Sequence, residues 1–140
     1  MSAEALEPEE QARANLYGLL ARLFYAPPER ELLASLAASG EIAAADAHSA
    51  FAAAWRALKS AAAAADVEAL REEYEGVFVG TGKAEVTLYG GAYAVRTALD
   101  NPLVKLREFL AANRLVRRDN VAEPEDHLAA KIQKVLEHLL

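Results

Sequence analysis

Apolar residues recur at three- and four-residue intervals along most of this chain, which is the spacing of one face of an α-helix. The first such run extends from Pro8 to Tyr25, and the pair Pro27-Pro28 ends it because proline cannot continue the helical hydrogen-bond pattern. A second, shorter helix is expected from Pro28 to about Ala38, with Gly40 just beyond its end. The N-terminal part of the chain therefore predicts two consecutive helices.

The same spacing predicts further helices in the rest of the chain. Asp66 is suited to be the N-cap of one of them, Asn113 to be the left-handed residue that ends another, and Trp55 to anchor the core. The expected ranges are 46–65, 66 to about 78, about 91–99, 102–112 and 123–139.

Two segments between these runs do not have the helical pattern. Gly80-Thr-Gly-Lys-Ala84 is a loop, and it lacks the glycine spacing and the Ser or Thr of a phosphate-binding P-loop. Glu85-Val-Thr-Leu-Tyr89 resembles a β-strand but is too short to build a sheet. We therefore expect an all-α fold, a single-domain bundle of about six to seven helices spanning residues 1–140.

Composition and charge agree with this fold and narrow the function. Hydrophobic residues make up 54% of the chain and aromatic residues only 7%, which favours packed helices. The net charge of −6 argues against a nucleic acid as the binding partner and favours a cationic one. The chain has no cysteine, its first residues are acidic rather than basic, and no apolar run is long enough to cross a bilayer. We expect a cytoplasmic location.

A proline, three carboxylates and a histidine stand close together directly before the last apolar run. We call residues Glu123–His127 the acidic turn. In one interpretation it is only a helix start, with Pro124 at the first helical position and acidic residues near the positive end of the helix dipole. In the other it is an acidic, titratable site that holds a cationic group.

The order of residues in the acidic turn is similar to a known signature. Glu123-Pro124-x-Asp126-His127, followed by Leu128-Ala129, resembles the E-P-x-D-H motif of the TorD-type chaperones (TorD/DmsD/NarJ-like), cytoplasmic all-helical proteins that help molybdenum-containing oxidoreductases mature. A second resemblance lies upstream, in Tyr74-Glu-Gly-Val-Phe78-Val-Gly80, a loop, and Leu88-Tyr89-Gly-Gly-Ala-Tyr93. The usual proline-rich loop and the serine before the last tyrosine are absent.

The resemblance implies a chaperone that binds an apo-molybdoenzyme catalytic subunit or its twin-arginine leader peptide and assists cofactor insertion. Carboxylates of the acidic turn would accept bidentate hydrogen bonds from arginine, and an apolar groove would take the leader's hydrophobic part. The site residues that it implies are four in the acidic turn, Glu123, Pro124, Asp126 and His127, and four aromatic residues for the groove, Tyr74, Phe78, Tyr89 and Tyr93.

Two other classes of function remain open. One is a small enzyme, for instance a nucleotide hydrolase, using Asp126 and His127; adjacent residues on a helix diverge by about 100°, which disfavours their cooperation. The other is a helical dimerisation module without a peptide groove. Glu123 and His127 alone do not make a metal site, so we expect no catalysis, no metal and no cofactor.

The last apolar run ends at Leu139-Leu140 without a cap or a polar tail. TorD-type proteins usually continue with further helices. We therefore expect a chain shortened at its C-terminus, whose last apolar face is covered by a second copy through dimerisation or helix swapping.

Overall fold

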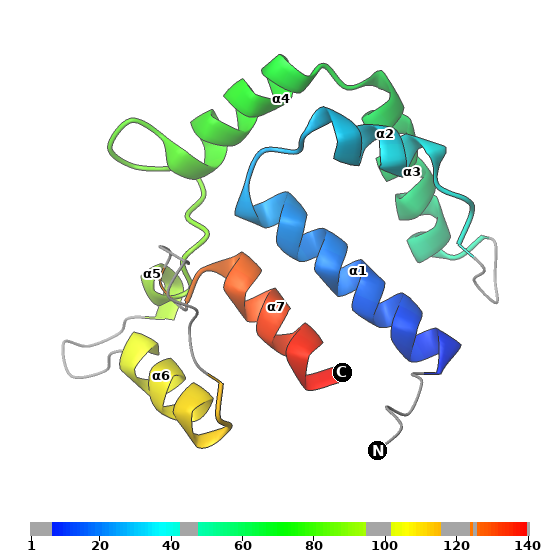
Figure 1. Cartoon of the computed structure of the whole chain (residues 1–140). Helices are drawn as coiled ribbons and strands as arrows, with labels where there is room; N and C mark the ends of the chain where they lie inside the picture. Colours follow the sequence, from blue (N-terminus) through cyan, green and yellow to red (C-terminus); the bar gives the residue numbers. More distant parts are fainter. Residues whose placement is uncertain (1–6, 43–47, 95–101, 116–123, 125, 140) are drawn as a thin grey trace.

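A computed structural model describes residues 7–42, 48–94, 102–115, 124 and 126–139, and this part of the chain is all-helical. Figure 1 shows how the helices follow one another. The elements are α1 (Pro8–Tyr25), α2 (Arg30–Ala38), α3 (Ala50–Ala64), α4 (Val67–Tyr74), the π-helix η1 (Glu75–Val79), α5 (Gly91–Ala94), α6 (Pro102–Ala112) and α7 (Leu128–Leu139). The predicted all-α fold is confirmed.

Side-chain caps fix where two of the helices begin. Asp66 Oδ1 accepts a hydrogen bond from Ala69 N at 2.8 Å, which confirms Asp66 as the N-cap of α4. Ser49 Oγ accepts from Ala52 N at 3.2 Å and starts α3 at Ala50, whereas the sequence predicted a start at Asp46. Residues 43–47 lie outside the described part of the chain.

The main hydrophobic core lies where the first four helices meet. Leu32, Leu33 and Leu36 of α2 are buried against Ala62 of α3. Half-buried residues of the other two helices pack around them: Leu19 and Leu23 of α1, and Val67 and Leu70 of α4. Because each of these helices is amphipathic, the core forms from the stripe that each one contributes.

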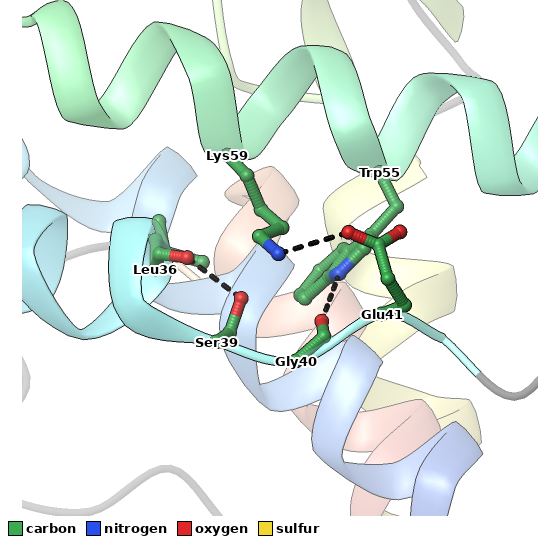
Figure 2. A network of polar contacts seen from close by, with 6 residues as sticks. All are labelled: Leu36, Ser39, Gly40, Glu41, Trp55 and Lys59. Atoms are coloured by element: carbon green, nitrogen blue, oxygen red, sulfur yellow. Dashed lines mark hydrogen bonds and ion pairs between the residues drawn. The ribbon is translucent and has the colours of Figure 1, made fainter.

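Trp55 adds polar contacts that hold the α2–α3 connection against α3. Its ring packs on the core, and its Nε1 donates to Gly40 O at 3.1 Å. Lys59 Nζ, one turn along α3, lies 3.1 Å from Glu41 Oε1 (Figure 2). The predicted anchoring role of Trp55 is thus found in the structure, with the indole half-buried at the edge of the core.

The last helix, α7, lies alongside the first helix, α1 (Figure 1). Buried alanines, Ala14 and Ala21 on α1 and Ala129 on α7, are small enough to let helices approach closely. In this structure α7 is therefore covered by another part of the same chain. The expected dimerisation or helix swapping stays a prediction.

Helix α6 ends at Ala112, as predicted, but the left-handed residue that follows it is Arg114, at φ 58°, and not Asn113. Leu115 N donates to Leu110 O at 2.9 Å and Arg114 N to Ala111 O at 3.0 Å, the paired bonds of a Schellman motif, so the hydrogen-bond pattern selects this position.

The predicted start of the last helix, at Glu123-Pro124, is wrong. Helix α7 begins at Leu128. Pro124 lies instead in a turn, where its carbonyl oxygen accepts from His127 N at 3.1 Å. The amide of Leu128 donates to Leu88 O, in a different segment of the chain, at 2.7 Å. The backbone just before α7 is thus hydrogen-bonded to a distant segment of the same chain, and the helix begins only at Leu128.

The strand-like segment forms no sheet within the described residues, as predicted, but it makes one isolated antiparallel bridge, between Tyr89 and His127. The loop before it is set by Gly80, whose φ is 65°. A Cβ at Gly80 would lie 2.5 Å from the carbonyl oxygen of Lys83, so only glycine fits there. The loop ends η1 and leads the chain to the bridge.

Candidate functional site

The acidic turn and the segment around Tyr89 are held together by backbone hydrogen bonds. Gly90 N donates to Asp126 O at 2.9 Å, and Leu128 N donates to Leu88 O at 2.7 Å, on either side of the Tyr89–His127 bridge. The two sequence motifs that resemble TorD-type chaperones therefore meet in space. The structure places them on one site.

Asp126 is buried, with 8% of its surface exposed. Its Oδ2 accepts a hydrogen bond from Gly91 N, the first residue of α5, at 3.0 Å. A buried carboxylate is stable only when it is hydrogen-bonded, and a bond from a backbone N–H to a charged oxygen is stronger than a neutral one. One oxygen of Asp126 is thus committed to the backbone of its own chain.

His127 is buried as well, with 5% of its surface exposed. Its Nδ1 accepts from Ala129 N at 3.1 Å, an arrangement that requires this nitrogen to carry no proton. Two tyrosine rings contact the imidazole edge to face. The distance between ring centroids is 5.1 Å for Tyr89 and 6.4 Å for Tyr25. His127 therefore both caps the first turn of α7 and packs between aromatic rings.

Beside these contacts lies a pocket of about 270 Å³. It opens between the end of α1, the π-helix, the bridged segment and α7. Most of its lining is apolar, and two charged side chains, Asp126 and Lys131, contribute to it. The lining residues are Phe24, Phe78, Val86, Thr87, Leu88, Gly90, Tyr93, Asp126, Leu128 and Lys131.

Aromatic contacts build the wall of the pocket that comes from α1 and η1. The rings of Phe24 and Phe78 meet edge to face at 6.2 Å, and Tyr74 meets Phe78 at 5.1 Å. Tyr74 Oη donates to Phe24 O at 2.9 Å, which ties the end of α1 to the end of α4. The π-helix follows directly and carries Phe78; π-helical turns are frequent at functional sites.

The structure brings only some of the predicted site residues to the pocket. Phe78, Tyr93 and Asp126 line it. Tyr74 supports the wall from behind, while Tyr89 and His127 pack on each other next to it. Of the other two residues, Pro124 accepts a hydrogen bond from His127 N in the turn before α7, and Glu123 lies outside the described residues.

Sequence reasoning missed several residues of the pocket. Phe24 lies at the end of the apolar stripe of α1, which by itself would place it in the core, yet it is half-buried and lines the pocket. Lys131 was not singled out in the sequence, and its side chain reaches over Gly90. The signal that could have found Lys131 is its position one turn after His127, on the same side of α7.

The described residues contain no group of three or more His, Cys, Asp or Glu side chains that could hold a metal ion. Of the helices whose placement is described, none combines the length and hydrophobicity needed to cross a membrane.

The fold is that of a known class of protein. The chain resembles a solved structure from Archaeoglobus fulgidus that is described as a redox enzyme maturation protein, with a TM-score of 0.60 and 14% sequence identity over 99% of this chain and 75% of that one. The profile of the nitrate reductase delta subunit family matches residues 44–139. This chain belongs to the nitrate reductase delta subunit family. Comparison with curated protein sequences gives no significant match.

Proposed function

We propose that this protein is a cytoplasmic chaperone that binds the apo form of a molybdenum-containing oxidoreductase, through its twin-arginine leader or a related segment, and assists cofactor insertion. Membership of the nitrate reductase delta subunit family supports a role in molybdoenzyme maturation. The observation that carries the proposal is the pocket. Residues of both motifs, Phe78 and Tyr93 from one and Asp126 from the other, line the same mostly apolar hollow.

The shape and chemistry of the pocket suit a peptide side chain. Its volume of about 270 Å³ is below the usual range for drug-sized ligands, about 300–1,000 Å³, and is suited to one or two apolar side chains. Tyr93 and Val86, 68% and 45% exposed, extend the apolar surface beyond its mouth. We propose that the hydrophobic part of the leader binds here and that the acidic turn, with Glu123, Pro124, Asp126 and His127, forms the polar end of the site.

The geometry favours binding over the alternative of a nucleotide hydrolase. Asp126 Oδ2 is directed to Gly91 N, and His127 Nδ1 is directed to Ala129 N. Each side chain thus accepts a hydrogen bond from a backbone amide. Neither of these bonds joins Asp126 to His127, whereas a pair that activates a nucleophile has to be hydrogen-bonded to each other. This arrangement supports a structural or binding role for the acidic turn.

The test is calorimetric titration with a synthetic twin-arginine leader peptide and with the same peptide carrying lysine in place of both arginines. We expect micromolar binding of the first, weakened with lysine because lysine cannot form the bidentate pair. Tyr93→Ala should weaken binding by about tenfold through lost apolar contact. Phe51→Ala is the control, since Phe51 is also an exposed aromatic residue, 47% exposed, but lies on α3, away from the pocket lining.

The outcomes separate the hypotheses. Equal weakening by Tyr93→Ala and Phe51→Ala would remove the pocket from the proposal. No heat with either peptide would contradict leader recognition and shift the proposal to the folded body of the client. Hydrolysis of a nucleotide by the pure protein, lost in Asp126→Ala, would favour the enzyme.

A further inference from the structure

Three hydrogen bonds join the segment before α5 to the segment before α7, and two of them end on Asp126. Gly90 N donates to the backbone oxygen of Asp126 at 2.9 Å, and Gly91 N donates to its side-chain Oδ2 at 3.0 Å. Leu128 N donates to Leu88 O at 2.7 Å. We call these five residues, Leu88, Gly90, Gly91, Asp126 and Leu128, the latch.

Space is restricted at both glycines of the latch, by Asp126 at Gly91 and by the movable side chain of Lys131 at Gly90. A Cβ at Gly91 would lie 2.8 Å from Asp126 Oδ2, too close for contact. A Cβ at Gly90 would collide with the ammonium group of Lys131 and lie 3.4 Å from Asp126 O. Neither glycine has a positive φ, so the backbone itself would accept alanine. The close approach of Asp126 is what excludes a side chain at Gly91.

The latch is also a wall of the pocket. Four of its five residues, Leu88, Gly90, Asp126 and Leu128, line the hollow. Leu88 and Asp126 are buried, each with 8% of its surface exposed, so the carboxylate sits where losing its partner is costly. If the Gly91 bond were lost, only the two backbone bonds would hold the segment carrying Leu88 and Tyr93 against the start of α7, and this segment would open more often.

We propose that Asp126 is the positioning residue of the polar end of the site: its carboxylate forms the pocket by holding Gly91 against the start of α7 and does not itself pair with an arginine of the partner. This refinement rests on the proposed function, because it uses peptide binding as one readout. It assigns to Gly91 a role equal to that of Asp126, although the two lie in different motifs. It also predicts which substitutions of Asp126 are tolerated.

Two substitutions of Asp126 distinguish positioning from direct contact. Asp126→Asn removes the charge but keeps an oxygen that can accept from Gly91 N, so we expect leader affinity within about twofold of wild type. Asp126→Ala removes the acceptor, so we expect about tenfold weaker binding. If Asp126 contacted the guanidinium directly, both substitutions would weaken binding alike, because the contact needs the charge.

Gly91→Ala tests the latch from its other side. We expect it to weaken binding about as much as Asp126→Ala, because the added Cβ displaces Oδ2. In the double variant the carboxylate is gone, so adding Gly91→Ala should have little further effect. Gly40→Ala is the matched control, since a Cβ at Gly40 meets nothing within 4 Å.

Amide hydrogen–deuterium exchange over residues 86–94 gives a readout that needs no peptide. Exchange should be faster in Asp126→Ala and Gly91→Ala and unchanged in Asp126→Asn and Gly40→Ala. Leu33→Ala, in the core between α2 and α3, controls for general destabilisation: it should lower the melting temperature without a selective change in this segment or in affinity.

Several results would overturn the proposal. One is unchanged exchange in Asp126→Ala, and another is additive loss of affinity in the double variant. Loss of affinity in Asp126→Asn with unchanged exchange would assign direct contact to the carboxylate. Absence of peptide binding by the wild-type protein would contradict leader recognition, while the exchange measurements alone would still decide whether the latch exists.

Discussion

At the scale of single residues, the site depends on polar groups that serve the chain's own backbone. Tyr74 Oη reaches Phe24 O across the end of α1, and Asp126 Oδ2 reaches Gly91 N at the start of α5. Such bonds contribute modestly when made, but a buried group left without its partner is costly. The side chains that resemble a chaperone motif are therefore also structural, and each substitution has to be chosen to separate the two roles.

The Tyr74 hydroxyl provides a prediction at this scale. Tyr74→Phe keeps the ring contact with Phe78 and removes the half-buried bond to Phe24 O, so we expect a loss of about 1 kcal/mol in the free energy of unfolding. Tyr93→Phe is the control, because its bond to Thr87 O is exposed to water and should contribute less. Urea unfolding measures both; equal losses would contradict the burial argument.

At the scale of elements, the helices begin and end through local chemistry and then meet through their apolar stripes. Ser49 and Asp66 cap α3 and α4, and the paired bonds around Arg114 close α6. Helix α4 then continues into the π-helix η1, which brings Phe78 to the pocket wall. A weakened α4 would therefore affect both the core and the position of η1.

The cap of α4 gives the prediction for this scale. Asp66→Ala removes the acceptor for Ala69 N and should lower the free energy of unfolding by about 1 kcal/mol. Asp66→Ser should retain most of the stability because serine is an equally good N-cap. Thermal unfolding followed by circular dichroism compares them, and an unaltered melting temperature in Asp66→Ala would show that the cap does not limit stability.

At the scale of the whole molecule, net charge and exposed apolar surface govern what approaches it. The chain carries a net charge of −6, which would attract the proposed cationic leader before any specific contact is made. Helix α6 presents Phe109, 59% exposed, and Val104, 45% exposed. Homodimerisation stays a prediction, which sedimentation of the purified protein would test.

Long-range attraction makes binding sensitive to salt. Raising the ionic strength to physiological values shortens the screening length to about 8 Å, so we expect several-fold weaker binding of the twin-arginine peptide than at low salt. A peptide with glutamine in place of both arginines should show a smaller salt dependence. Calorimetry at two salt concentrations measures this; an affinity independent of salt would leave net charge without a role.

The positions of the helices were largely predictable, because they depend on neighbours in sequence. Apolar spacing predicted α1 from Pro8 to Tyr25 and α6 from Pro102 to Ala112, and the side-chain chemistry of Asp66 predicted its cap. Boundaries that depend on distant partners were not predictable. The amide of Leu128 donates to Leu88 O, a residue far away in sequence. Helix α7 therefore begins four residues after Pro124, where the sequence alone predicted its start.

The sequence by itself determined the helical class, the acidic character and the two motifs, since each is a property of residue type and local spacing. The tertiary structure decided that the motifs meet, that Phe24 belongs to the pocket rather than the core, and that Asp126 faces Gly91. The physical reason is that a helix's periodicity specifies which face is apolar, while the partner of a buried polar group is set by packing between segments distant in sequence.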